Sequence, residues 1–401
     1  MPMKYDFDEP VMRRGTHCVK WDEKAPTPDI IPMWVADMDF KAAPAIQDAL
    51  RRRVEHGVFG YSIVPEDYYR SVINWFERRH HWTIEREWIQ YTTGVVPALS
   101  VIVQAFTKPG DKVILQAPVY NCFFSSIRNN GCEILSSSLL YSNNDERTFT
   151  YTMDYDDLEA KAADPRTRLL LLCNPHNPAG RVWTREELQR VADICRKHHV
   201  IVVSDEIHNE LTYDGRRYVP FGTIDMDNAI ICTSASKSFN IAGLQMANII
   251  CCHEDWRQKI DRSININEVC DVNPFGPLAA IAAYNESEQW MDELCDYLWQ
   301  NYQELRTFFA QQMPQLPVAE LEGTYLVWVD ISTTGLTADE LTERLLREGR
   351  VQVNSSTMYG CEGFIRINIA CPRAMMLEGL SRIAAVISSL ASHPSHSSQL
   401  S

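Results

Sequence analysis

The chain has 401 residues, of which 45% are hydrophobic and 23% charged, and its formal net charge is −15. This profile is that of a globular protein long enough for about two domains, and the acidic balance argues against nucleic acid and anionic membranes as partners. There is no apolar run of about 18 residues and no apolar signal core near the N-terminus, so we expect neither a membrane span nor a secretion signal.

The twelve cysteines show neither zinc-site spacing nor a disulfide-framework pattern. In a long chain without an export signal we expect them to be reduced thiols, which favours a cytoplasmic location. The end of the chain, residues 388–401, is rich in Ser and His and cannot bury apolar surface. We expect a frayed end there rather than a metal-binding tail.

In chain order, residues 1–45 are irregular and Pro-rich, and we expect this N-terminal segment to pack with a small C-terminal domain. Residues 46–285 alternate apolar runs with amphipathic patterns, the clearest being a helix over 184–199 with Thr184 and Glu187 as a capping box. The apolar runs are continuous, as in strands buried on both faces, and cover 112–118, 167–175, 200–208, 228–237 and 247–252. This alternation predicts a large α/β domain with a mostly parallel central sheet flanked by helices.

The last third of the chain predicts a second, smaller α/β domain over residues 286–392, followed by a disordered tail, 393–401. Its expected strands and helices are 323–332, 364–370, 337–349 and 373–392. A long helical stretch over about 276–312 is expected to join the two domains.

Polar and aromatic residues follow four of the apolar runs, where a plain turn would not require them. They are "APVYNCFF" (117–124), "NPHNPAGRVW" (174–183), "SDEIH" (204–208) and "TSASKSFN" (233–240). Because ligands bind beyond the carboxyl ends of the strands in open parallel sheets, these four segments predict one shared site.

Lys237 lies among small residues in the last of these segments. It is either a solvated loop lysine or a pocket amine that forms an imine. An imine-forming lysine needs a lowered pKa and a carbonyl cofactor that accepts electrons, and pyridoxal 5'-phosphate is such a cofactor. That cofactor requires an acidic residue at its pyridine nitrogen, an aromatic face over its ring, and backbone donors at a helix start for its phosphate.

Three segments offer these groups. Asp205 closes an apolar run and suits the pyridine nitrogen, although for this residue taken alone a helix cap or a salt bridge with Arg or Lys is the favoured explanation. Tyr120 suits the ring face, with a core tyrosine as the alternative. "TTGVVPAL" (92–99) suits the phosphate, with an ordinary capped helix as the alternative.

Four further side chains are candidates for the same site. Asn177, in a Pro-rich turn, and His208 could face the phenolate oxygen of the cofactor, although a lone histidine is more often structural. Ser234 and Ser236 flank the lysine and could donate hydrogen bonds to the phosphate.

The motifs "NPHNPAG", "SDEIH" and "SASKSFNIAG", in this order, resemble the fold-type-I pyridoxal-phosphate enzymes of the aminotransferase class I/II family, over roughly residues 1–390. Within that family the chain looks most similar to the cystathionine β-lyase branch, the cysteine C–S β-lyases. The segments that carry this closer likeness are 5–22, 34–40, 56–62, 204–211 and 236–244. The resemblance implies the type I PLP-dependent transferase fold.

The resemblance also implies roles at the cofactor ring. Lys237 would carry the imine and then move a proton at the substrate α-carbon, and Asp205 would pair with the pyridinium nitrogen. Asn177 and His208 would face the ring hydroxyl. Tyr120 would stack on the ring and help to protonate the leaving group.

The remaining implied roles concern the phosphate and the substrate. Arg366 would clamp the substrate α-carboxylate through a two-point pair. Tyr61 would reach the phosphate of the neighbouring subunit across a homodimer. The residues expected at the phosphate are Gly94, Val95, Ser234 and Ser236, and those expected on the substrate side are Val35 and Ala36.

One position departs from the pattern of many aminotransferases in this family, which carry an arginine eight residues after the imine-forming lysine. Here that position is Gln245, which favours the lyase branch. The implied reaction is the α,β-elimination of L-cystathionine or a related cysteine thioether to pyruvate, ammonia and a thiol. The alternatives are an aminotransferase and a non-catalytic interaction module. No metal site is expected.

Overall fold

The computed structural model describes residues 3–23, 27, 29–268 and 270–392, so the expected disordered tail, 393–401, lies outside the described residues. The α-helices are α1 (Pro44–His56), α2 (Glu66–His80), α3 (Val95–Phe106), α4 (Asn121–Asn129), α5 (Tyr155–Ala162), α6 (Arg185–Lys197), α7 (Gly222–Asp225), α8 (Glu254–Ile266), α9 (Gly276–Glu286), α10 (Glu288–Gln312), α11 (Ala338–Arg347) and α12 (Arg373–Ser392). The strands are β1 (Ile31–Pro32), β2 (Ile89–Thr92), β3 (Lys112–Leu115), β4 (Glu133–Ser136), β5 (Leu140–Asn143), β6 (Thr148–Thr152), β7 (Thr167–Cys173), β8 (Ile201–Asp205), β9 (Ala229–Thr233), β10 (Ala247–Ile250), β11 (Val318–Ala319), β12 (Leu326–Asp330), β13 (Val351–Gln352), β14 (Asn354–Ser355) and β15 (Phe364–Asn368).

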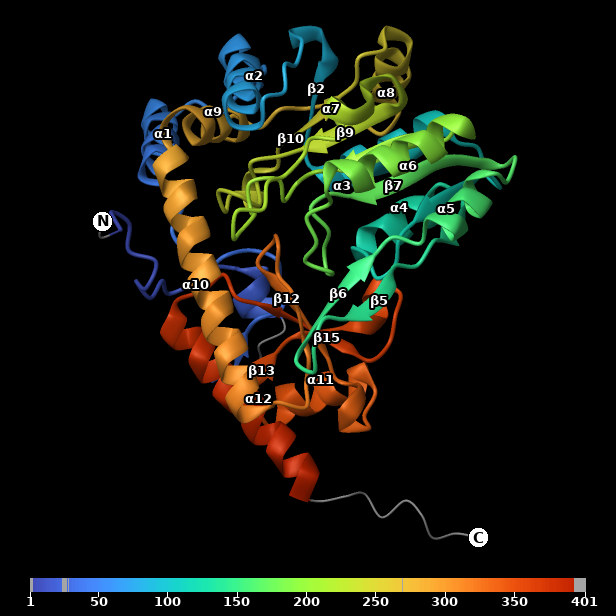
Figure 1. Cartoon of the computed structure of the whole chain (residues 1–401). Helices are drawn as coiled ribbons and strands as arrows, with labels where there is room; N and C mark the ends of the chain where they lie inside the picture. The colour runs from blue at the N-terminus through green and yellow to red at the C-terminus, as the bar shows by residue number, and fades with distance from the viewer. Residues whose placement is uncertain (1–2, 24–26, 28, 269, 393–401) are drawn as a thin grey trace.

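The upper lobe in Figure 1 is built on a seven-stranded sheet with the order β2-β10-β9-β8-β7-β3-β4. The expected mostly parallel α/β sheet is confirmed, since β4, β3, β7, β8 and β9 pair in parallel. Only β10, from the apolar run 247–252, is antiparallel to both of its neighbours in this sheet. The chain between β9 and β10 contains only a short 3-10 turn in place of a crossover helix, and a parallel connection would need that helix.

Both faces of this sheet are buried, which explains the continuous apolar runs. In β7, Leu169 and Leu171 point into one core cluster, and Leu170 and Leu172 point into the other. This alternation is the period of two of a strand, with helices supplying the opposing side chains on each face. Helix α6 covers one face, and the predicted capping box between Thr184 and Glu187 is present at its start.

The lower lobe contains a six-stranded sheet with the order β14-β15-β12-β11-β6-β5. Its strands β5 and β6 form a hairpin. Both strands lie within residues 46–285, the range that sequence analysis predicted for the larger domain. Strand β6 pairs in parallel with β11, with Val318 opposite Thr148, so this hairpin extends the second sheet (Figure 1). A pairing between such distant segments leaves no mark on local periodicity, and sequence analysis could not detect it.

A long helix joins the lobes along one side of the molecule (Figure 1). The helical stretch expected over about 276–312 is interrupted at Ser287, where α9 ends and α10 begins. The Ser287 hydroxyl donates to the Ala282 carbonyl at 3.0 Å, a local side-chain bond that competes with continuation of the helix. Among the described residues, none of the helices has the length and apolarity that a membrane crossing requires.

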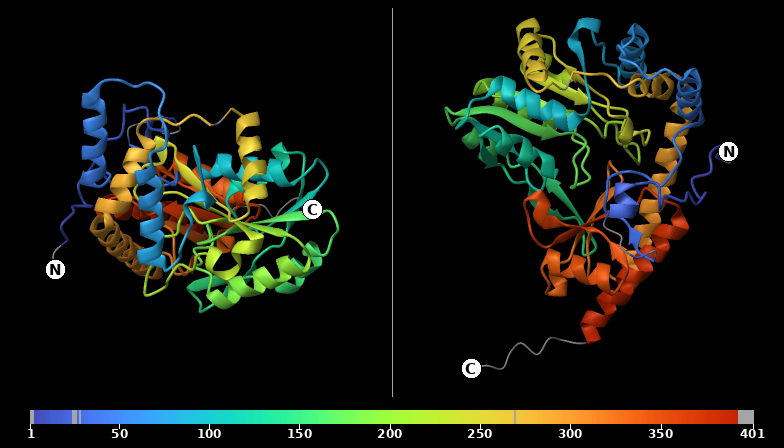
Figure 2. Two further views of the ribbon diagram at one scale, coloured as in Figure 1. Left: turned by 90° about the horizontal axis from the view of Figure 1, so that it is seen from above. Right: turned by 180° about the vertical axis from the view of Figure 1, so that it is seen from behind.

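The N-terminal segment lies against the lower lobe (Figure 2). Strand β1 pairs in parallel with β13, with Ile31 opposite Val351.

Ion pairs between two cations and two carboxylates also hold parts of the N-terminal segment together. Asp39, 3% exposed, accepts from Lys20 Nζ at 2.6 Å and from Arg13 Nη1 at 2.6 Å, and Arg13 also pairs with Asp37. We call Arg13, Lys20, Asp37 and Asp39 the N-terminal charge cluster.

Candidate active site

A cavity of about 230 Å³ lies at the carboxyl ends of β7 and β8, beside the start of α3. The sequence prediction of a shared site at these strand ends is matched by this cavity. The predicted residues that line it are Ala36, Gly94, Val95, Tyr120, Asn177, Asp205, His208, Ser236 and Lys237.

Lys237 is a pocket amine and not a solvated loop lysine. Its Nζ donates to the carbonyl oxygen of Ala36 at 2.6 Å, across 201 residues of sequence. Burial lowers the pKa of this ammonium from 10.5 to about 8, although the carboxylates of Asp37 and Asp205 favour the charged form. A fraction of Lys237 is therefore an uncharged, nucleophilic amine at neutral pH, and this fraction grows as the pH rises through about 8.

Asp205 is the last residue of β8 and is buried in the same cavity. Burial raises the pKa of its carboxyl from 3.8 to about 7, and the N–H of Ile207, which donates to Oδ1 at 3.1 Å, opposes that rise only in part. Its neighbour Glu206 points to the other face of the strand. Glu206 accepts from Ser204, Asn174, Tyr218 and the Phe221 N–H. Glu206 is therefore already satisfied, whereas Asp205 presents a carboxylate that suits a cationic ligand group.

Two neutral polar side chains face the cavity near these charges. Burial lowers the pKa of His208 well below its ordinary value, and the nearby cations Lys237 and Arg366 add to this effect, so its imidazole is neutral. Its Nδ1 is buried and has no hydrogen-bond partner among the described residues. Asn177 Oδ1 accepts from Arg366 Nη1 at 3.1 Å, which leaves the amide N–H groups of Asn177 available to a ligand.

The start of α3 contributes backbone donors to the cavity. Gly94 is the N-cap residue, and no side chain caps the helix, so the first N–H groups of this turn lack the partner that caps usually supply. Such a helix start binds phosphate readily. Ser236 lines the cavity beside it. Ser234 does not line the cavity, because its hydroxyl donates to the Met246 carbonyl at 2.6 Å and accepts from the Ser236 N–H at 3.0 Å.

Arg366 lies on β15 of the lower sheet and is 3% exposed. It does not itself line the cavity, but it is bonded to Asn177, which does. Besides the bond to Asn177, its Nη2 donates to the carbonyl of Trp34 at 2.9 Å, and its Nε is buried without a partner among the described residues. Two residues further along the strand, Asn368 donates to the carbonyl of Val35 at 2.6 Å. Val35 therefore contributes a backbone oxygen here, and its side chain does not line the cavity.

Tyr61 is not brought to the cavity of its own chain. Its side chain is fully exposed at 100%. The segment around it carries several large apolar side chains that are also exposed. These are Val54, Val58, Phe59, Tyr61 and Ile63.

Some residues that shape the site were not predicted from the sequence. The Tyr325 hydroxyl donates to the same Ala36 carbonyl as Lys237, at 2.9 Å, and its ring contacts His208. Trp34 contributes only a carbonyl oxygen, which no residue pattern reveals. Asn368 could have been found, because it lies at position i+2 from Arg366 and therefore shares its face of a strand.

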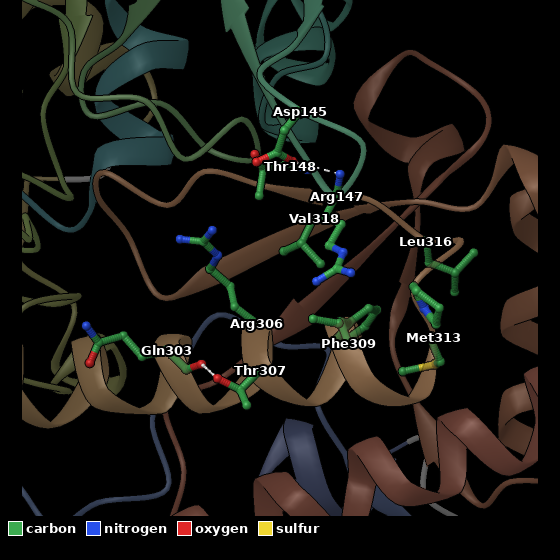
Figure 3. Close-up of a pocket in the computed structure, with 12 residues that line it drawn as sticks. Asp145, Arg147, Thr148, Gln303, Arg306, Thr307, Phe309, Met313, Leu316 and Val318 are labelled. Atoms are coloured by element: carbon green, nitrogen blue, oxygen red, sulfur yellow. Dashed lines mark hydrogen bonds between the residues drawn. The ribbon is translucent and has the colours of Figure 1, made fainter.

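A second cavity, of about 440 Å³, lies between the end of the β5–β6 hairpin and α10 (Figure 3). The side chains of Arg147 and Arg306 extend into it, and Phe309 and Leu316 are among the apolar side chains that line it (Figure 3). It contains none of the predicted site residues and no buried amine or carboxylate pair. Of these two cavities, the first is therefore the candidate active site.

The residues of the first cavity fit pyridoxal phosphate. Asp205 offers a buried carboxylate for the pyridinium, the orphaned Nδ1 of His208 and the amide of Asn177 suit the ring oxygen, and the uncapped start of α3 suits the phosphate. Tyr120 and the amine of Lys237 complete the lining. The fold and the site together define an enzyme of the pyridoxal-phosphate fold type I.

Comparison with known proteins agrees with this class. The family model for aminotransferase class I and II matches residues 30–383. Cystathionine beta-lyase PatB of Bacillus subtilis is 41% identical over 391 residues, which cover 96% of this chain and 100% of that protein. The crystal structure of cystalysin from Treponema denticola, which contains a pyridoxal 5'-phosphate cofactor, superposes with a TM-score of 0.92 at 34% identity and covers 97% of this chain and 100% of that one. A PLP-bound C–S lyase from Staphylococcus hominis matches with a TM-score of 0.87 at 31% identity, over 96% and 99% of the two chains. The chain therefore belongs to the aminotransferase class I and II family.

Proposed function

We propose that this chain is a pyridoxal-phosphate-dependent C–S β-lyase that cleaves L-cystathionine or a related cysteine thioether to pyruvate, ammonia and a thiol. The observation that carries the proposal is the half-buried, partly uncharged amine of Lys237 in one cavity with the carboxylate of Asp205. When bound, the cofactor supplies an electron sink for negative charge at the α-carbon of an amino acid. Orientation of the substrate and proton transfer fall to side chains of the protein.

Arg366 orients the substrate. Its guanidinium is already fixed by bonds to Asn177 and to the carbonyl of Trp34, and it binds the α-carboxylate with charge-assisted hydrogen bonds. Holding the carboxylate in this way places the α-proton toward Lys237. Because burial favours the neutral amine, Lys237 Nζ can accept that proton near neutral pH.

Tyr120 supplies a proton to the leaving sulfur. Burial raises the pKa of its phenol above the ordinary value of 10, and the neighbouring Cys122 adds to this, so Tyr120 keeps its proton until a thiolate develops beside it. The departing group then leaves as a thiol. The cavity also excludes most bulk water, since Asp205, His208 and Asn177 are each at most 3% exposed.

Gln245 favours elimination over transamination. It is an exposed residue outside the cavity, and among the described residues Lys237 is the one lysine or arginine that lines the cavity. An aminotransferase would have to retain the cofactor through its phosphate contacts between two half-reactions, whereas a lyase has no such interval. A lyase would therefore depend less on a phosphate-binding arginine.

The function is tested by incubating purified protein with pyridoxal phosphate and L-cystathionine, without any keto acid. We expect equal amounts of pyruvate and free thiol, and no product from Lys237→Ala. An aminotransferase would instead form product only when an α-keto acid is added, and that result would reverse the proposal.

We further propose that the protein is a cytoplasmic homodimer whose sites include Tyr61 of the adjacent subunit. The exposed apolar segment around Tyr61 supports this, because apolar side chains gathered on a surface mark interaction sites. If Tyr61→Ala and Lys237→Ala chains are co-expressed, each mixed dimer should contain one complete site and recover activity that neither variant has alone. A mixture of Asp205→Asn and Lys237→Ala is the control and should recover none, because both residues line the cavity of the same chain.

A further inference from the structure

A thiol, an imidazole and a carboxylate converge far from the proposed active site, at the opposite end of β9. Asp227 lies in the 3-10 turn Met226–Asn228 that leads into β9, and Cys252 and His253 lie between β10 and α8. One ligand atom from each of the three residues lies within 4.8 Å of the other two.

The sheet register explains why these residues meet. Strands β9 and β10 are antiparallel, with Ile250 opposite Ile231. The residues that follow β10 therefore lie beside those that precede β9. Arg257 holds the loop in place by donating to the carbonyls of Cys251 at 3.0 Å and Cys252 at 2.7 Å.

The hydrogen bonds within the group leave one ring nitrogen of His253 with a lone pair that a metal could bind. His253 Nε2 lies 2.8 Å from the backbone carbonyl of Asp227, which can only accept, so this nitrogen carries the proton and Nδ1 carries a lone pair. A backbone carbonyl on the second ring nitrogen is the usual support of a metal-binding histidine. The Cys252 thiol donates to the Met226 carbonyl at 3.3 Å, a weak bond that a metal would replace.

We propose that Asp227, Cys252 and His253 form a binding site for a divalent zinc-like cation. Sulfur, nitrogen and carboxylate oxygen are the ligands that zinc takes in proteins, and three protein ligands leave a fourth, tetrahedral position for water. The half-buried positions of Cys252 and His253 allow entry from solvent. The ligand atoms would have to move about 1 Å closer together to coordinate one ion. Small rotations of these side chains at the protein surface would allow that shift.

The bound ion would fasten the segment that precedes β9 to the segment that follows β10, and β9 is the strand that leads to Lys237. It would not touch the chemistry, because Lys237 follows the other end of that strand. This site is therefore independent of the proposed lyase function, and its failure would leave that function intact.

The test uses full-length holoenzyme in which His393 and His396 are replaced by alanine, so that the His-containing tail cannot compete. Titration with Co²⁺ alone should produce a thiolate-to-cobalt charge-transfer absorption that saturates at one ion per chain. We expect Cys252→Ser to abolish this absorption, and His253→Ala or Asp227→Asn to weaken the binding at least about 10-fold. Cys270→Ser, which removes an exposed cysteine elsewhere, is the matched control and should leave it unchanged.

Zinc should also displace the cobalt and raise the unfolding temperature of the parent protein, but not that of Cys252→Ser. Two results would overturn the site. One is a charge-transfer absorption that persists in Cys252→Ser, and the other is saturable zinc stabilisation that the three substitutions do not reduce.

Discussion

Replacement of Lys20 by methionine should destabilise the protein strongly, although Lys20 lies in the N-terminal segment, in a single helical turn over Val19–Glu23. Lys20 is 1% exposed, and its Nζ lies 2.6 Å from the Asp39 carboxylate, which is 3% exposed. Methionine has a similar volume, so the main loss is the charge. Removing one partner of a buried ion pair costs about 3–5 kcal/mol, because the other charge stays buried. Asp39 keeps Arg13 and the indole N–H of Trp21, so we expect a loss near the lower end, about 3 kcal/mol.

The assay is chemical denaturation of the holoenzyme followed by tryptophan fluorescence. Lys41→Met is the matched control, because Lys41 pairs with Glu9 at the surface, where the two side chains are 55% and 45% exposed. Surface pairs contribute at most about 1 kcal/mol, so this control should unfold almost as the parent protein does. Adding Asp39→Asn to Lys20→Met should recover part of the loss. If Lys20→Met and Lys41→Met proved equally stable, the buried pair would not carry the energy assigned to it.

Three further predictions concern the active site. Asp205→Asn should stabilise the cofactor-free protein above pH 7 by up to about 4 kcal/mol, because burial raises the pKa of this carboxyl from 3.8 to about 7. Denaturation measured across pH should show that this stabilisation disappears as the pH falls toward 4, where the aspartic acid is also uncharged. The rate at which pyridoxal phosphate is covalently captured, measured by borohydride trapping and mass spectrometry, should rise with pH through about 8 as Lys237 loses its proton, and a rate independent of pH would contradict the lowered pKa. Arg366→Lys should lower kcat/KM about 100-fold, because lysine cannot form the two-point pair, while bound cofactor measured by absorbance stays unchanged; loss of the cofactor instead would assign Arg366 to its retention.

Sequence analysis located the cavity because its signals are local. The residues after parallel strands gather at one edge of a sheet, so Asp205 and Lys237 could be placed together from their positions alone. The capping box at Thr184 is equally local. The motif around Asn177 predicted a turn near that edge, and the structure places its amide in the cavity.

The features that sequence analysis missed depend on contacts between distant segments. The carbonyls of Trp34 and Ala36 accept hydrogen bonds from Arg366, Tyr325 and Lys237, and a backbone oxygen has no signature in the residue pattern. Sequence alone suggested that Ser234 donates to phosphate, but its hydroxyl proton is used on the Met246 carbonyl, an interaction set by the packing of the loop between β9 and β10. Whether Tyr61 completes the site of a second subunit stays a prediction.

The pairing of β6 with β11 has a consequence for synthesis of the chain. Thr148 and its partner Val318 are separated by 318 − 148 = 170 residues. At about 5–20 residues per second, the β5–β6 hairpin would emerge from the ribosome roughly 10–30 s before the strand that covers its edge. An uncovered strand edge is a template for pairing with other chains. If translation is stopped after β6 but before β11, the nascent chain should therefore bind holdase chaperones. The chaperones should dissociate once β11 has been synthesised and covers the edge of β6.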